Sequence, residues 1–176
     1  MGPGKISIVS FGDQPCVPAE RICSALASRY DLTCEILPNE PKPNFALNAV
    51  RDQYDALTLL SHLEKRFDDP NQMVLATTEV DLFISVFTFV FGQARLAGRV
   101  AIISSFRLRE QYYGRPGEDE LLFSRVEKSA IHEVGHMMGL THCADHNCVM
   151  HASNTIADTD VKSSLLCPNC RASLSL

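Results

Sequence analysis

The chain has 176 residues, and its 45% hydrophobic content is enough to build the core of one compact domain. Its net charge of −5, without a basic stripe that alternates with aromatic residues, argues against a nucleic-acid-binding protein. No segment approaches the roughly 18 apolar residues of a membrane span, and the N-terminus lacks the apolar stretch and cleavage site of a signal peptide. We therefore expect a monomeric, cytoplasmic, single-domain protein over residues 1–176, with no membrane or nucleic-acid partner.

The first third of the chain is expected to alternate strands and helices. Residues 5–11 predict a strand, residues 18–30 a helix, and residues 31–37 a second strand. A longer helix is expected over residues 46–67, because apolar residues recur at helical spacing on one face, namely Ala56, Leu60, Leu63 and Phe67.

Three cysteines and one histidine in this region carry no recognisable metal-binding pattern. Cys16, Cys23 and Cys34 lack partners at metal spacing, so we expect them to be ordinary thiols in the core. His62 lies off the apolar face of the long helix, so we expect it to be solvated rather than to bind a metal.

The middle of the chain predicts further strands. Residues 73–76 and 81–86 are strand candidates, and residues 89–94 and 99–104 are expected to form two antiparallel strands joined by a short turn. A loop rich in Arg, Gly and Pro follows over residues 107–119 and precedes a helix. The apolar face of that helix is Phe123, Val126, Ala130, Val134 and Met137.

The end of this helix carries a metal-binding pattern. His132 and His136 are four residues apart, so both imidazoles lie on one helical face, with Glu133 beside them. Gly139 can take a positive φ, which ends the helix and lets the chain turn back so that His142 supplies a third imidazole. A helix with incidental histidines is the alternative, but the two added residues at fixed offsets make it a poor one.

Three protein ligands leave the fourth position of a zinc ion open for water, which is the mark of a catalytic site. The pKa of that water falls to roughly 7, and Glu133 is the natural general base that takes its proton and passes it to the leaving amine. The zinc would polarise the scissile carbonyl. The pattern therefore predicts a zinc hydrolase.

A second zinc site is expected in the last quarter of the chain, because four thiolates close a tetrahedral coordination sphere and so form a structural site. The four cysteines are Cys143, Cys148, Cys167 and Cys170. Two disulfides, or reduced thiols packed as small apolar groups, remain as alternatives. His146 lies between the first two and would be a substitute ligand, although four cysteines already suffice.

Cys143 directly follows His142, and neighbouring side chains on non-helical backbone point in different directions. The two residues can therefore serve two separate metals. We expect that loss of the cysteine site would loosen His142 and weaken the catalytic zinc.

This succession of motifs resembles the archaemetzincin family: an extended zinc motif, a cysteine directly after the third histidine, a second cysteine shortly before Met150, and a late Cys-x-x-Cys. Residues 53–60, 89–94 and 104–108 are also similar to the family. The resemblance implies a metzincin-like zinc metallopeptidase. It also implies that Met150 belongs to the turn beneath the catalytic zinc, where its adaptable side chain would pack under the histidines.

In metzincins an edge strand binds the substrate backbone through main-chain hydrogen bonds, so the resemblance implies that Phe91, Gly92, Gln93 and Ala94 line the cleft. A buried hairpin with no role in binding remains open, because a sequence does not show which strand is the edge. Three further residues near the site, Tyr112, Tyr113 and His151, are expected mainly to pack.

The sequence thus predicts a metzincin-like α/β (α+β) fold with a twisted mixed sheet, packing helices and an active-site helix. Residues 1–142 are expected to form the main part, and residues 143–176 a small C-terminal subdomain braced by zinc. Two zinc ions, one catalytic and one structural, and a short-peptide substrate are expected. A noncatalytic zinc-dependent binding module and an amidase acting on small non-peptide molecules are the alternatives.

Overall fold

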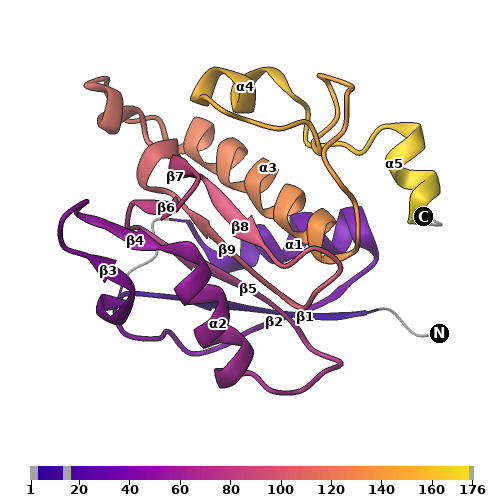
Figure 1. Cartoon of the computed structure of the whole chain (residues 1–176). Coiled ribbons are helices and arrows are strands. Elements are labelled where there is room, and N and C mark those ends of the chain that lie inside the picture. The colour runs from indigo at the N-terminus through magenta and orange to yellow at the C-terminus, as the bar shows by residue number, and fades with distance from the viewer. Residues whose placement is uncertain (1–3, 14–16, 175–176) are drawn as a thin grey trace.

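The computed structural model describes residues 4–13 and 17–174, and its centre is a five-stranded mixed sheet (Figure 1). The strand order is β2-β1-β5-β9-β8. Four strands are parallel, namely β1 (Lys5–Ser10), β2 (Thr33–Ile36), β5 (Met73–Thr78) and β9 (Val100–Ser104). The fifth, β8 (Gly92–Ala94), is antiparallel to β9 and lies at the edge of the sheet.

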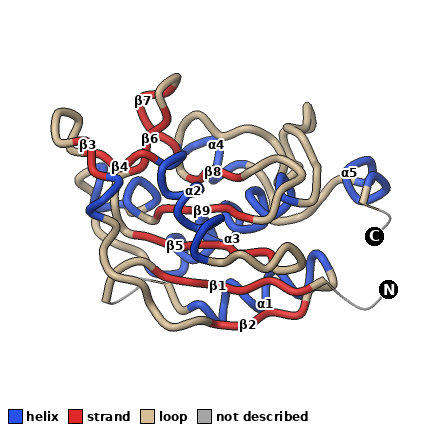
Figure 2. Tube along the Cα trace, turned by 60° about the horizontal axis from the view of Figure 1, so that its bottom comes forward, coloured by secondary structure: helices blue, strands red, loops and turns tan. Residues whose placement is uncertain are grey.

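Helices cover both faces of this sheet, because successive strand residues point to opposite sides. Ile6 and Ile8 of β1 pack into a core with α1 (Ala19–Tyr30) and α3 (Asp119–Met137). Val9, on the other face, packs into a second core with α2 (Ala56–Arg66). The views in Figures 1 and 2 agree with this three-layer arrangement, which confirms the expected mixed α/β fold.

A smaller sheet, in the order β3-β4-β6-β7, adjoins the central one. Its strands are β3 (Leu47–Asn48), β4 (Gln53–Asp55), β6 (Leu82–Ile84) and β7 (Phe87–Val90). The prediction of a continuous helix over residues 46–67 is therefore wrong in its first half, where a 3-10 turn (Asn44–Ala46) leads into β3 and β4.

The physical reason lies at Asp52 and Asp55. Asp52 has a φ of 53°, which breaks any helix, and the Asp55 carboxylate accepts hydrogen bonds from the backbone N–H groups of Leu57 and Thr58. This N-cap starts α2 at Ala56, so only the second half of the predicted helix forms.

The strand expected over residues 89–94 is divided between the two sheets. Residues up to Val90 belong to β7, which pairs with β6, whereas Gly92–Ala94 forms β8 and pairs with β9. The predicted antiparallel pair is thus confirmed for β8 and β9 only. Because the chain changes sheets at Phe91, this residue stands where the two sheets meet.

The segments on either side of α3 carry little regular structure. Two 3-10 turns (Phe106–Leu108 and Glu110–Tyr113) occupy the expected loop before α3. After α3 come α4 (Ile156–Val161) and the final short helix α5 (Pro168–Ser173). Figure 1 shows α4 beside α3, with α5 at the far end of the same layer. Among the described helices, none is long and apolar enough to serve as a membrane span.

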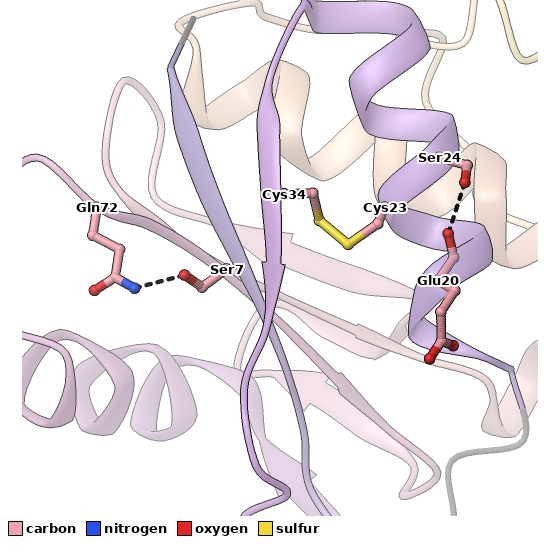
Figure 3. Close-up of a disulfide and its surroundings, with 6 residues drawn as sticks. All are labelled: Ser7, Glu20, Cys23, Ser24, Cys34 and Gln72. Carbon is pink, nitrogen blue, oxygen red and sulfur yellow. Dashed lines mark hydrogen bonds between the residues drawn. A yellow bond between two sulfur atoms is a disulfide. The ribbon is translucent and has the colours of Figure 1, made fainter.

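The expectation of free core thiols is wrong for Cys23 and Cys34, which form a disulfide between α1 and β2 (Figure 3). Asp31 takes a left-handed conformation after α1, so the chain reverses and β2 runs back under the helix. The two Cα atoms then lie 5.4 Å apart, a distance that suits a disulfide. Spacing along the chain does not show this proximity. Cys16 lies outside the described residues.

His62 is also less solvated than expected. Its ring packs on Phe45, with ring centroids 4.5 Å apart, and Phe11 lies 6.2 Å away on the same measure. The 3-10 turn that carries Phe45 replaces the first turns of the expected long helix, and it brings an aromatic ring over this side of α2.

Candidate active site

The helix α3 is held firmly on the sheet by its apolar face. Val126, Ala130, Val134 and Met137 are all buried in the core that α3 shares with β1 and β9. Since one side of the helix is fixed in this way, the other side is presented to a cleft. The side chains of the histidine motif project from that second side, which lines a cavity of about 380 Å³.

The three motif histidines converge at one point. His132 and His136 bring their Nε2 atoms to 3.1 Å, and one ligand nitrogen of each of the three imidazoles lies within 4.8 Å of the others. The ring of His142 has its centroid 5.3 Å from that of His132 and 4.9 Å from that of His136. The structure therefore brings together all three imidazoles of the sequence motif.

The outer ring nitrogens of two histidines are engaged by backbone carbonyls. The Nδ1 of His132 lies 2.8 Å from the carbonyl oxygen of Val149, and the Nδ1 of His136 lies 2.7 Å from that of Leu140. An Nδ1–H that donates to a carbonyl fixes the tautomer and leaves the Nε2 lone pair free for a metal. Burial lowers the pKa of all three imidazoles, well below 6.5 for His132, which favours their neutral, ligating form.

The return of the chain after α3 depends on Gly139, which has a φ of 95°. Its N–H donates to the carbonyl of His136, and the N–H of Leu140 donates to that of Gly135, each at 2.9 Å. The N–H of Ala97, in the turn between β8 and β9, also donates to the carbonyl of His136. These bonds satisfy the end of the helix and turn the chain toward His142.

Glu133 is buried between α3 and the edge strand β8. Its side chain contacts Gly92 so closely that a Cβ atom at that position would lie 2.8 Å from both its Cγ and its Oε1. Only glycine therefore allows the strand to pass this near the carboxylate. Burial raises the pKa of the Glu133 carboxyl to about 8, and the positive charge of Lys162 opposes that rise.

A second cluster gathers the four C-terminal cysteines. The Sγ atoms of Cys143 and Cys167 lie 3.8 Å apart, as do those of Cys148 and Cys170, and all four lie within 4.8 Å of one another. All four thiols are free, so the alternative of two disulfides does not apply. His146 is not part of this cluster, because its ring packs against His151 instead.

Both clusters suit zinc by the chemistry and spacing of their donors. Zinc lies about 2.3 Å from each sulfur ligand, so the sulfur atoms of a tetrahedral site are about 3.8 Å apart. Two pairs of cysteine sulfurs have this separation here. Zinc lies about 2.0–2.1 Å from an imidazole nitrogen, so two nitrogen ligands of a tetrahedral site are about 3.4 Å apart. The Nε2 atoms of the two helical imidazoles are 3.1 Å apart, close to this value. Three imidazoles and four thiols are also the donor sets typical of a catalytic and a structural zinc, respectively.

The segment between the clusters contacts both. The N–H of Cys143 donates to the carbonyl of Met150 at 3.0 Å, and the carbonyl of Val149, next to Cys148, lies at His132. Met150 is fully buried, and a Cβ atom on Gly135 would overlap its sulfur. Met150 thus packs directly against the α3 backbone between the two helical histidines.

The cavity follows the edge strand as the resemblance implied, although not along its whole length. Phe91, Gly92 and Gln93 line it together with Glu133, whereas Ala94 is not among its lining residues. The strand β8 is the edge of the central sheet, so the alternative of a buried hairpin without access to the cleft does not hold for these three residues.

Several lining residues were not singled out from the sequence. Lys162, Ser153 and Thr159 come from the segment around α4, and Phe87 and Phe89 come from β7. Lys162 is 3% exposed, and burial lowers the pKa of its ammonium to about 8, an effect that Glu133 opposes. It follows a short polar helix in the sequence, where no pattern distinguishes it from a solvated lysine.

Two of the segments that resemble the family, residues 53–60 and 104–108, meet in one hydrogen-bond network, whereas the third, residues 89–94, supplies part of the cavity lining itself. Asp81 accepts two hydrogen bonds from Arg107, at 2.6 and 2.7 Å, and one from Gln53 at 2.9 Å. Gln53 also donates to the carbonyl of Thr88, in β7. The network links β4 and β7 of the smaller sheet with the 3-10 turn that follows β9, and so helps to position β7, which forms part of one wall of the cavity.

The remaining candidates lie away from the cavity and pack, as expected. Tyr112 and Tyr113 make an edge-to-face contact, and the hydroxyl of Tyr113 donates to the carbonyl of Arg107. His151 places its Nδ1 2.8 Å from the carbonyl of Cys143. None of these three lines the cavity in the described part of the chain.

Comparison with known proteins identifies the family. The model for peptidase family M54 matches residues 21–175. The chain belongs to this family. It is 43% identical to an archaemetzincin of Methanocaldococcus jannaschii over 137 residues, which are 78% of this chain and 74% of that protein. The chain is therefore an archaemetzincin-family zinc metallopeptidase, as its motifs predicted.

Solved structures support the same assignment. The crystal structure of an archaemetzincin from Methanopyrus kandleri has a TM-score of 0.85 at 32% identity, and the match covers 98% of this chain and 94% of that one. The structure of a zinc-dependent peptidase from Methanocorpusculum labreanum has a TM-score of 0.83 at 26% identity and covers 96% and 99%. The metzincin-like fold predicted for this chain is thereby confirmed.

Proposed function

We propose that this protein hydrolyses peptide bonds in short peptides, with Glu133 as the general base and a catalytic zinc held by His132, His136 and His142. One observation carries the proposal. Three imidazole nitrogens lie within 4.8 Å of one another beside a buried carboxylate, and all four side chains line one cavity. A zinc ion held there supplies a Lewis acid that acidifies water and polarises the scissile carbonyl.

Glu133 performs the proton transfers. A carboxylate that is poorly solvated holds a proton more firmly than one in water, so burial makes Glu133 a stronger base than a surface glutamate. It accepts a proton from the attacking water and delivers it to the nitrogen of the leaving amine. The close approach of Gly92 limits the space into which the carboxylate can move, which favours both transfers.

The edge strand β8 would bind the substrate backbone. Its inner side is paired with β9 through Gly92, Gln93 and Ala94, and its other side is the edge of the sheet. An extended peptide can hydrogen-bond along that edge and pass its side chains into the cavity, where Phe91 contributes an apolar wall. A volume of about 380 Å³ is in the range of small-ligand sites, which favours short peptides.

The cysteine cluster would hold a second, structural zinc that braces the first site. Cys143 is adjacent to His142, and its backbone N–H donates a hydrogen bond to the carbonyl of Met150. A displacement of the cysteine cluster would therefore also displace His142 and Met150. Met150 would serve as the apolar floor of the turn below the histidines. We therefore propose one functional domain over residues 1–176, in which residues 143–176 stabilise the active site formed by residues 1–142.

The test is cleavage of a mixed short-peptide library by the zinc-loaded protein, read by mass spectrometry. A Glu133→Ala variant with equal zinc content is the control, because it keeps the imidazoles and removes only the base. Cleavage by the wild type alone supports the proposal, and the product ends show whether the enzyme trims or cuts internally.

Two alternatives have distinct outcomes in the same test. A noncatalytic zinc-dependent binding module would bind peptides without cleaving them, but metal binding alone does not require a buried carboxylate at Glu133. An amidase would leave peptides intact and hydrolyse small amides, and only this second substrate panel separates the two activities, since the chemistry is the same.

A further inference from the structure

A buried lysine lies in the wall of the proposed active site. Lys162 directly follows α4, is 3% exposed and lines the same cavity as Glu133 and the three histidines. Among the described residues that line this cavity, Lys162 and Glu133 are the only ones of the types Asp, Glu, Lys and Arg. A fully buried ammonium is expensive unless its hydrogen bonds and its charge are compensated.

The ammonium of Lys162 has few acceptors within the protein. It donates one hydrogen bond, to the carbonyl of His151 at 2.9 Å. Its other close polar neighbour is the Nδ1 of His132 at 3.4 Å, but that nitrogen must carry a hydrogen to bond the carbonyl of Val149 at 2.8 Å. Two donors do not form a hydrogen bond with each other, so this contact satisfies neither group.

The nearby carboxylates offer little compensation. Asp160 accepts both of its hydrogen bonds from Arg125, and Asp158 accepts from Thr155 in the capping box of α4. Glu133 is the remaining negative group that faces the cavity. However, the close polar neighbours of the Lys162 ammonium in the described part of the chain are the two groups named above, and the Glu133 carboxylate is not one of them.

We propose that Lys162 binds a carboxylate of the substrate, so that the peptides preferred by this enzyme carry an acidic side chain or a free C-terminal carboxylate close to the scissile bond. The inference rests on the proposed function and names the substrate class of the same site. Ser153 also lines the cavity, and its hydroxyl has no hydrogen-bond partner among the described residues. It provides a further donor for an anionic group in this wall.

Two other roles for Lys162 make different predictions. If the lysine only braces the segment after Met150 through the carbonyl of His151, its replacement changes stability and not the choice between substrates. If it stabilises charge on the reacting carbonyl, its replacement slows all substrates by the same factor. A carboxylate-binding lysine instead changes the ratio between charged and neutral substrates.

The experiment measures the binding of peptide hydroxamates to zinc-loaded protein by isothermal titration calorimetry. One series places the peptide before the chelating hydroxamate and the other places it after. Both series contain peptide pairs that differ only by Glu or Gln at one position and that have no free C-terminal carboxylate. The second series also contains pairs that differ only by a free carboxylate or an amide at the C-terminus. The pairs distinguish an acidic side chain from a terminal carboxylate. Selectivity in cleavage of the corresponding peptides is measured in parallel.

The proteins compared are the wild type, Lys162→Met, Lys162→Gln and Lys128→Met. The glutamine variant loses the charge but keeps a donor for the carbonyl of His151. Lys128 is the matched control, because its ammonium binds the carbonyls of Thr159 and Asp160 near the same helix without lining the cavity. Folding and zinc content are verified for each variant before titration.

The wild type and Lys128→Met are expected to prefer the carboxylate member of at least one pair by about 10- to 100-fold, as charge-assisted hydrogen bonds do. Both Lys162 variants are expected to lose that preference. Equal affinity within every pair in the wild type would overturn the inference, as would a preference retained in a folded Lys162 variant. Because binding is read without turnover, a lack of cleavage tests the proposed function separately.

Discussion

The contact between Gly92 and Glu133 allows a sharp test of how the edge strand positions the base. In Gly92→Ala the added Cβ would lie 2.8 Å from the Cγ and the Oε1 of Glu133. Carbon atoms in favourable contact are about 3.5–4.0 Å apart, so the carboxylate or the strand must move by about 0.7–1.2 Å. The strand is paired with β9, and the N–H of Ser104 is bonded to the carbonyl of Phe91, so we expect the glutamate to move.

The expected cost is larger in activity than in stability. A displacement of about 1 Å at a catalytic group lowers the rate by about 100-fold, so Gly92→Ala should lose about 10- to 100-fold in kcat. Overpacking of this kind destabilises a protein by about 1–3 kcal/mol. The three atoms nearest to the added methyl group all belong to Glu133 and none to a histidine, so zinc content should be unchanged.

The assay is steady-state cleavage of a peptide selected from the library, combined with metal analysis and urea unfolding. Gly117→Ala is the matched control, because there the three atoms nearest to the added Cβ belong to the end of the exposed Gln111 side chain, which can rotate away. Wild-type kcat in a folded, zinc-loaded Gly92→Ala protein would refute the argument that the strand positions the base.

Three further predictions concern metal, stability and pH. Cys170→Ser should lower zinc from two to one per chain and weaken retention of the other by about 10- to 100-fold in a chelator competition; unchanged retention would disprove the coupling. Arg125→Met removes a guanidinium that is 1% exposed and forms ion pairs with Asp160 and Glu110. The free energy of unfolding measured in urea should therefore fall by about 3 kcal/mol, and an unchanged value would show that these ion pairs do not stabilise the fold. Zinc-free protein should lose stability as pH falls below 6.5. Burial lowers the pKa of all three histidines, so the unfolded chain binds their protons more readily than the folded one, and the raised pKa of the single Glu133 offsets only part of this effect; urea midpoints that stay level or rise from pH 6.5 to about pH 5 would contradict this.

The elements with strong local signals were predictable. The strand at residues 5–11, the helix at 18–30 and the active-site helix form close to the expected bounds, because their apolar residues repeat with a single period. The helix expected over residues 46–67 shows where local reasoning fails. The helical spacing on which it rested lies in residues 56–67, and before them the pairing of β4 with β6, 28 residues away, stabilises a strand instead.

The candidate site divides in the same way. His132, His136 and Gly139 lie within one short segment, so the sequence alone predicts that the imidazoles of His132, His136 and His142 converge. Cys23 and Cys34 illustrate the opposite case, since their distance depends on how β2 returns beneath α1. The division of residues 89–94 between two sheets likewise depends on which strands are available to pair.

The sequence by itself indicated the family, the donor groups of two candidate metal clusters and the candidate base, because short-range backbone geometry controls where residues a few positions apart can point. Only the tertiary structure decided that β8 is the edge strand, that Gly92 abuts Glu133, and that Lys162 enters the cavity. These contacts join segments far apart in the chain. Their distances are set by the packing of whole layers, about which a local pattern carries no information.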